Sequence, residues 1–228
     1  MPDLDRDGNV FVLNLGDDEN RFNPDWVGAV NALLAEVAAT DGPRALVLSA
    51  TGKNWSQGLD LEWFAANVEQ VPAFIPEVHE LYARVLTFPA PVIAAIQGHC
   101  YAAGAMLSLA ADERIMREDR GYWCLPEADI NIPFTHGMDA LIKSRLRPQV
   151  AHEAMVFATR YGAPDAVAAE IVNSAVGEEH VLSAAVERAE ALSAKNGDTL
   201  AAIKQRLYAP AVAALRDREA NAIPGLGG

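Results

Sequence analysis

Two short, almost wholly apolar runs constrain the fold most strongly. They read ALVLSA at residues 45–50 and PVIAAI at residues 91–96, and turn-forming residues follow or precede each of them. Runs of this length and composition are typical of strands that are buried on both faces, as in a parallel sheet. A helical pattern follows each run, so the sequence predicts an α/β fold in which buried strands are joined by helices.

Periodicity and turn residues predict the other elements. Residues 9–15 alternate loosely as a strand, and Asn23 with Pro24 opens a helix as its N-cap and first residue. The further elements expected in chain order are a loop at 51–58, helices at 59–68 and 75–87, a strand at 113–119, an irregular segment at 121–134, helices from 139 onward, a strand at 173–176, and helices at 179–195 and 199–217, the last capped by Asp198 or Thr199.

Charge and composition argue against several functional classes. The net charge of −13 disfavours nucleic acid as a partner, because phosphates require a basic face. No run approaches the roughly 20 apolar residues of a membrane span, and the polar, acidic N-terminus is untypical of a secretory signal. Cys100 and Cys124 lack metal-site spacing, and no two histidines are spaced as zinc ligands. We therefore expect a cytoplasmic protein without a metal site or membrane segment.

Two stretches share one design, in which a buried strand leads through small residues into a helix. One reads ALVLSA-TGKNWSQG-LDLEWF and the other PVIAAI-QGHCYAAG-AMLSL. The N-terminus of a helix leaves backbone N–H groups without partners, and small residues let a ligand approach them. Two such ends aimed at one point would form a backbone oxyanion site. Taken singly, each stretch is more simply explained as a tight connection between a strand and a helix.

Familiar nucleotide and nucleophile motifs are absent. Gly52-Lys53 is followed by Asn54, which breaks the spelling of a P-loop, and no G-x-G-x-x-G occurs. Ser56 resembles a nucleophile elbow, but Asn54 stands where that motif requires glycine. These departures argue against phosphoryl transfer, dinucleotide chemistry and serine hydrolysis.

Glu127 is the carboxylate with the most unusual surroundings in the sequence. It lies in LPEADINIPF, where most neighbours are apolar. Apolar surroundings disfavour the charged form and raise the pKa, which suits a base that must also return its proton near neutral pH. Two alternatives stay open: Glu127 caps a turn and faces solvent, or Asp129 takes the role instead.

Three motifs in order carry a family resemblance. NWSQGLDL, IQGHCYAAGAMLSLAAD and LPEADINIPF together resemble the enoyl-CoA hydratase/isomerase (crotonase) family, over residues 9–176, and most closely its 3-enoyl-CoA to 2-enoyl-CoA isomerase branch. The resemblance implies a spiral of β-β-α units with two near-perpendicular sheets, assembled as a homotrimer or a dimer of trimers. It implies a spiral core at 1–176 and a short helical C-terminal region at 177–228.

The resemblance also assigns roles to residues. The N–H groups of Leu59 and Ala103 would hold the oxygen of an acyl-CoA thioester, and Glu127 would move the proton. Arg21 and Lys53 are candidates for the anionic end of coenzyme A, although Lys53 is more simply a surface charge. The residues expected to contact the substrate are Arg21, Ser56, Gly58, Asp60, Gly104 and Met106.

Met106 separates the possible reactions. Hydratase members carry a second glutamate at this position, and methionine cannot activate water. The resemblance therefore favours an isomerase that needs no cofactor beyond the coenzyme A of its substrate. Two alternatives stay open: a weak hydratase that uses Glu127 alone, and a non-catalytic acyl-CoA binder.

Overall fold

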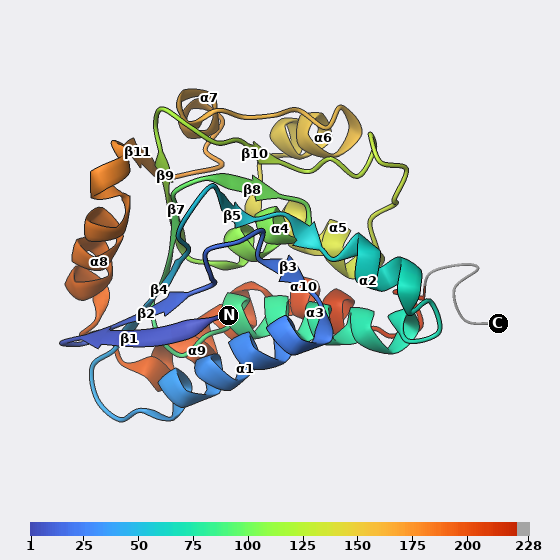
Figure 1. Cartoon of the computed structure of the whole chain (residues 1–228). Helices are drawn as coiled ribbons and strands as arrows, with labels where there is room; N and C mark the ends of the chain where they lie inside the picture. Colours follow the sequence, from blue (N-terminus) through green and yellow to red (C-terminus); the bar gives the residue numbers. More distant parts are fainter. Residues whose placement is uncertain (223–228) are drawn as a thin grey trace.

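The computed structural model describes residues 1–222 and is built around a six-stranded sheet (Figure 1). Its strand order is β1-β2-β4-β7-β9-β11; only the first pair is antiparallel, and the other neighbours run parallel. The strands are β1 (Asp3–Asp7), β2 (Val10–Asn14), β4 (Ala45–Ser49), β7 (Val92–Ile96), β9 (Glu113–Arg117) and β11 (Ser174–Val176).

A second, three-stranded sheet and a two-stranded sheet accompany the first. The former has the order β10-β8-β5 and the latter pairs β3 with β6. These strands are β3 (Arg21–Phe22), β5 (Asn54–Ser56), β6 (Gly58–Leu59), β8 (His99–Tyr101) and β10 (Trp123–Cys124). Three times in succession the chain passes through the large sheet, then the three-stranded sheet, then a helical segment, beginning at β4, β7 and β9. The predicted spiral of β-β-α units is confirmed.

The two apolar runs form β4 and β7 because both faces of the large sheet are covered. Leu46 and Leu48 face the larger core, where α1 and α3 pack, whereas Ala45 and Val47 face a smaller core closed by α8. Alternation with a period of two thus places each apolar side chain of β4 in one core or the other. Helices cover both sides of the sheet in Figure 1. They are α1 (Pro24–Ala39), α2 (Leu61–Ala66), α3 (Val71–Leu86), α4 (Ala103–Ala110), α5 (His136–Arg145), α6 (Pro148–Val156), α7 (Ala163–Ala168), α8 (Val181–Leu192), α9 (Gly197–Leu207) and α10 (Ala209–Arg216), with a 3₁₀ turn at Glu178–His180.

Capping residues and prolines determine where several helices begin. Asn23 caps α1 as predicted, since its side chain accepts a hydrogen bond from Trp26 N at 3.0 Å. The single helix predicted at 199–217 is wrong, because Tyr208 separates α9 from α10 and Pro210 lies in the first turn of α10. The cap of α9 is Asn196, not Asp198 or Thr199; its side chain accepts from Thr199 N at 2.9 Å.

Other boundaries also differ from the sequence predictions. The segment predicted as a loop at 51–58 contains β5 and the start of β6, and the strand β1 was not predicted. The helix predicted from residue 75 begins at Val71, because Pro72 fits its first turn and Pro76 does not end it. The two missed strands β5 and β6 depend on pairing partners far away in the sequence, because β8 pairs with β5 and β3 pairs with β6.

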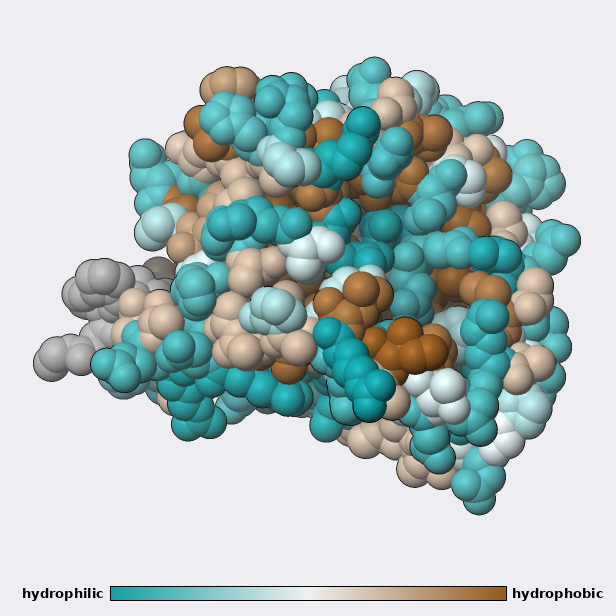
Figure 2. Space-filling view, turned by 180° about the vertical axis from the view of Figure 1, so that it is seen from behind, coloured by the Kyte–Doolittle hydropathy of each residue, from teal (hydrophilic) through white to brown (hydrophobic). Residues whose placement is uncertain are grey.

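The C-terminal region packs against the spiral core. α8 covers one face of the large sheet, and α10 lies against α3 and α5. Lys204 of α9 is buried, and its Nζ lies 2.6 Å from Asp112 Oδ2 and 3.0 Å from Ala90 O. Seen from behind (Figure 2), hydrophobic side chains interrupt a largely hydrophilic surface. By exposed fraction, Ile203 and Leu207 of α9 are among the large apolar residues that stay accessible to solvent. Within residues 1–222, no helix has the length and apolar character that crossing a bilayer requires.

Candidate active site

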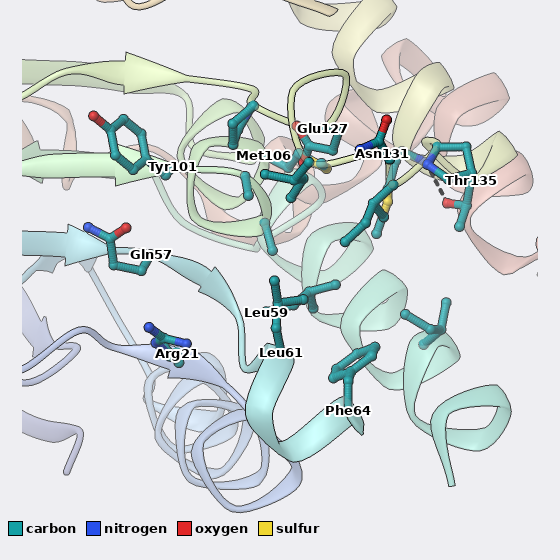
Figure 3. A pocket seen from close by; sticks show the side chains of 18 residues that line it. Arg21, Gln57, Leu59, Leu61, Phe64, Tyr101, Met106, Glu127, Asn131 and Thr135 are labelled. Atoms are coloured by element: carbon teal, nitrogen blue, oxygen red, sulfur yellow. Dashed lines mark hydrogen bonds between the residues drawn. The ribbon is translucent and has the colours of Figure 1, made fainter. Parts of the chain in front are cut away.

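A pocket of about 480 Å³ lies where both strand-to-helix turns meet the segment after β10 (Figure 3). Its walls are mostly apolar, and a few polar groups project into it. The lining residues are Arg21, Gln57, Leu59, Leu61, Phe64, Ile75, Tyr101, Ala102, Ala103, Met106, Pro126, Glu127, Ile130, Asn131, Ile132, Pro133, Thr135 and Met138. An apolar pocket with a few convergent polar groups is the usual form of a small-molecule site.

The first turn is held tightly by Ser56 and ends in a glycine. Ser56 Oγ donates to Asn20 O at 2.8 Å and accepts from Gly58 N at 3.1 Å. Gly58 has φ +85°, and a Cβ there would lie 2.9 Å from Ala103 N and 2.8 Å from Ala102 Cβ. Glycine is therefore required both by the backbone conformation and by the close approach of the second turn.

The N–H of Leu59 points away from the strand that holds it. Asp60 N donates to Phe22 O at 3.0 Å, and Phe22 stands opposite Leu59 in the parallel pair of β3 and β6. In such a ladder alternate residues of a strand bond to one neighbour, so the N–H of Leu59 faces the other side. No further strand of the described chain pairs with β6 there, and Leu59 lines the pocket.

The second turn delivers another N–H to the same pocket. Ala102 has φ 50° and ψ −124°, and its N–H donates to Cys124 O at 3.0 Å. Ala103 begins α4, so its N–H has no carbonyl four residues earlier within the helix. All eight residues of α4 are buried, which fixes the end of the helix against the pocket.

Glu127 is the buried carboxyl of the pocket. The segment that carries it is closed by hydrogen bonds from Asp129 N to Pro126 O at 2.9 Å and from Ile132 N to Glu127 O at 3.0 Å. The residue is 6% exposed, and its Oε2 is buried without a hydrogen-bond partner in residues 1–222. Burial raises the pKa of Glu127 from 4.5 to about 7. Asp129 is exposed, so the structure favours Glu127 over its sequence rival.

The chain matches a known protein family over most of its length. A family model described as enoyl-CoA hydratase/isomerase matches residues 5–222. The chain belongs to the enoyl-CoA hydratase/isomerase family. The family that the three motifs indicated is therefore confirmed.

Relatives in this family cover nearly the whole chain. A protein of Arabidopsis thaliana named enoyl-CoA delta isomerase 3 is 34% identical over 97% of this chain and 97% of its own length. Another from the same plant, named enoyl-CoA delta isomerase 2, peroxisomal, is 36% identical over 91% of this chain and 92% of its own.

Solved structures agree on the fold. The enoyl-CoA isomerase of Mycobacterium tuberculosis is similar with a TM-score of 0.87, 26% identity and 95% of each chain covered. Human mitochondrial delta3-delta2-enoyl-CoA isomerase is similar with a TM-score of 0.89 over 96% of this chain and 87% of its own. At 20% identity this second likeness supports the fold alone.

Two other residues singled out by the family resemblance line the pocket. Met106 lies on α4 and is 1% exposed, so it serves both the core and the pocket wall. Arg21 lines the pocket, and its Nε lies 2.7 Å from Glu19 Oε2. Lys53 is exposed and is not part of the lining, in agreement with an ordinary surface charge.

Four of the residues expected to contact substrate are not among the described lining residues and support the turns instead. Ser56 and Gly58 shape the first turn as described above. Asp60 caps α2, since its Oδ1 accepts from Trp63 N at 3.1 Å. Gly104 packs on Ser56, where an added Cβ would lie 2.6 Å from Ser56 Cβ. The motif residues thus build the geometry of the pocket more than its surface.

The sequence did not reveal several pocket residues. Figure 3 shows Tyr101 and Gln57 with Arg21 toward one side of the pocket, and Phe64 and Thr135 toward the other. Tyr101 lies on β8 and Phe64 on α2. Gln57 lies between β5 and β6, and Thr135 caps α5, so the fold brings together residues that are far apart in the sequence. Within residues 1–222, no group of His, Cys, Asp and Glu side chains gathers as a metal site would require.

Proposed function

We propose that this protein is an enoyl-CoA isomerase that moves the double bond of a 3-enoyl-CoA to the 2-position. The observation that carries the proposal is a single buried carboxyl, Glu127, with a free oxygen in the same pocket as the Leu59 and Ala103 backbone turns. The two plant relatives named enoyl-CoA delta isomerases support the same reaction.

The pocket gives the substrate a direction. In our proposal the thioester oxygen accepts from the N–H groups of Leu59 and Ala103. The coenzyme A end leaves past Arg21 and its polar neighbours, where a cation favours the anionic phosphates. The acyl chain then extends along the apolar side, past Phe64 and Ile75.

The chemistry is a proton shuttle on one face of the substrate. The Glu127 carboxylate removes a proton from C2, and the C2–H electrons spread over the dienolate and the thioester oxygen. The same carboxyl then gives its proton to C4, which leaves a double bond between C2 and C3. A pKa of about 7 suits both steps, because the group is basic enough to take the proton and acidic enough to return it.

The backbone donors stabilise the charge that develops on the oxygen. One such donor is worth about 10²–10³ in rate, because it is fixed in place before the reaction. Position 106 carries a methionine, which has no titratable group and whose thioether forms part of the pocket wall. Water addition would need a second acid or base there, so the site favours isomerisation over hydration.

The experiment compares 2-enoyl-CoA and 3-enoyl-CoA thioesters side by side, with the parent protein and Glu127→Gln. We expect the parent to isomerise the 3-enoyl substrate, and Glu127→Gln to lose about 10²–10⁴ in kcat. Asp129→Asn is the matched control, since it removes an exposed carboxylate two residues away.

Each alternative has its own outcome. Unchanged turnover in Glu127→Gln would rule out the proposed shuttle. Hydration of a 2-enoyl substrate as fast as isomerisation would favour a hydratase. Binding of acyl-CoA without turnover of either substrate would favour a non-catalytic binder.

Assembly and location remain predictions. The resemblance predicts a homotrimer or a dimer of trimers, and sedimentation equilibrium measures that directly. Composition predicts a cytoplasmic location, whereas the name of one plant relative includes the word peroxisomal. Imaging of the tagged full-length chain distinguishes the two compartments.

A further inference from the structure

Tyr82 is a buried tyrosine of α3 that lies outside the pocket lining yet contacts the oxyanion turn. Its side chain is 0% exposed, and its hydroxyl donates to Ala103 O at 3.2 Å. A buried tyrosine hydroxyl usually finds some partner, so one hydrogen bond alone would say little. The choice of partner is informative, because Ala103 is also the residue proposed to hold the thioester oxygen.

The ring of Tyr82 reaches the other half of the site. It lies 6.5 Å from the ring of Phe22, centroid to centroid, at an angle of 49°. Phe22 stands opposite Leu59 in the β3–β6 pair, and its carbonyl accepts from Asp60 N. One side chain therefore packs against the strand that holds the first N–H and bonds to the residue that carries the second.

The second turn needs such support because its backbone is strained. Ala102 has φ 50° and ψ −124°, a region that glycine adopts readily and other residues avoid. A residue held there is strained, and the strain persists only when the surroundings fix the backbone. The peptide between Ala102 and Ala103 carries the N–H in question, so relaxation of this strain would turn that N–H away from the pocket.

Three hydrogen bonds fix the turn on its two sides. Ala102 N donates to Cys124 O, and Met106 N donates to Ala102 O, each at 3.0 Å. Both of these join main-chain atoms. The third comes from the Tyr82 hydroxyl to Ala103 O and belongs to a side chain, so a substitution can remove it alone.

We infer that Tyr82 is a positioning residue of the oxyanion site, which holds the strained Ala102–Ala103 turn against β3 so that the Ala103 N–H stays aimed at the thioester oxygen. The inference rests on the proposed function. Tyr82 makes no contact with substrate in this scheme and acts through Ala103.

The test measures polarisation of the thioester directly. A saturated acyl-CoA with a ¹³C-labelled thioester carbonyl is bound to the protein, and its C=O stretch is recorded by infrared difference spectroscopy. The parent should lower that frequency relative to free ligand, because two N–H groups polarise the carbonyl. In Tyr82→Phe, which keeps the ring and removes the hydroxyl, we expect a smaller shift.

Kinetics supply a second readout. We expect kcat of Tyr82→Phe to fall about tenfold, less than the loss of a whole donor, because the N–H is displaced rather than removed. KM should change less than kcat, because the thioester oxygen bonds to the N–H groups more weakly in the ground state than when it carries the charge of the dienolate. The pH midpoint should stay near that of the parent, since Glu127 is unchanged. Tyr161→Phe is the matched control: that tyrosine is also buried, its hydroxyl lies 3.5 Å from Glu153 Oε2, and it is not among the described lining residues.

The outcomes separate the inference from the proposed function. A full carbonyl shift and full kcat in Tyr82→Phe, with only a lower melting temperature, would make Tyr82 merely structural and overturn the inference. A parent that binds the ligand but shifts no carbonyl would overturn the oxyanion site itself, and with it the proposed mechanism.

A rescue variant keeps the test informative if Tyr82→Phe folds poorly. Ala102→Gly removes the strain that the hydrogen bond is inferred to resist. In that background we expect Tyr82→Phe to cost less in kcat and in carbonyl shift than it does in the parent. An equal cost in both backgrounds would contradict the inferred link between Tyr82 and the strained turn.

Discussion

The two turns that form the pocket share a plan but have opposite surroundings. The second leads into α4, whose eight residues are all buried, whereas the first leads into α2, none of whose six residues is buried. α2 rests on its Asp60 cap and on a cluster of aromatic rings formed by Trp63, Phe64 and Phe74. The α4 wall of the pocket is thus part of the core, whereas the α2 wall is a single exposed helix that covers the pocket.

This difference suggests a division of labour. A helix inside a close-packed core cannot shift without cost, so we expect the Ala103 side to set the geometry of the proposed reaction. A short helix with few buried contacts adjusts at little cost, so we expect the α2 side to accommodate the acyl chain. Substitutions on the two sides should therefore differ in kind, with losses in kcat on one side and in KM on the other.

The largest loss of activity is expected for Gly58→Ala, because Gly58 lies where the two turns are in contact. The new Cβ would press on Ala103 N and Ala102 Cβ, so we expect kcat/KM to fall about 10²–10³, as for a lost oxyanion donor. Gly42→Ala is the matched control, because Gly42 also has φ +85° but has no atom within 4 Å of the added Cβ. Equal activity of the two variants would show that contact between the turns is not needed.

The pH profile tests whether both turns contribute only backbone groups. Backbone N–H groups do not titrate in the working range, so Glu127 alone should set the profile. Burial raises its pKa to about 7, and the carboxylate is the active form; kcat/KM should therefore rise with pH, reach half its plateau near pH 7, and fall about tenfold per unit below that. A flat profile from pH 5 to pH 8 would contradict this assignment.

Tight packing between the two turns should make the unfolding free energy sensitive to an added methyl group. In Gly104→Ala the added Cβ would lie 2.6 Å from Ser56 Cβ, and overpacking of this kind costs about 1–3 kcal/mol of unfolding free energy. Thermal or urea unfolding measures the loss. Gly28→Ala in α1 has open space around the new methyl and should gain up to about 1 kcal/mol instead. A Gly104→Ala protein as stable as the parent would mean that the two turns are not tightly packed.

The smallest effect is expected on the covering helix. Phe64→Ala removes apolar surface from the side of the pocket assigned to the acyl chain, so KM should rise about threefold to tenfold, most for long chains, with kcat unchanged. Phe157→Ala, an exposed phenylalanine outside the lining, is the control. A fall in kcat without a change in KM would contradict the division of labour.

Local signals explain what the sequence predicted correctly. β4 and β7 are recognisable as continuous apolar runs, because their side chains fill two cores. Asn23 marks the start of α1, because its side chain caps the helix. Glu127 stands out because its immediate neighbours are apolar, and the folded chain keeps them around it. In each case the signal that predicts the feature lies within a few residues or follows from composition alone.

The sequence predictions failed where residues far away in the sequence determine the structure. β5 and β6 have three and two residues and exist because β8 and β3 pair with them. Ser56 and Gly104 belong to the motifs, yet neither lines the pocket: Ser56 bonds to Asn20 and Gly58, and Gly104 packs against Ser56. Tyr82 reads in the sequence as one more apolar position of α3, and only the folded chain shows its hydroxyl beside Ala103.

Met106 has a consequence for changing the reaction of this fold. A glutamate placed there would line the same apolar pocket as Glu127, and two like charges in such a space raise the pKa of at least one of them. A raised pKa at Glu127 would lower the fraction of that group in its carboxylate form at neutral pH, before any gain from a second carboxylate. Conversion of this chain into a hydratase therefore requires new hydrogen-bond donors around residue 106 as well as the carboxylate, so a single substitution would sacrifice the old activity without supplying the new one.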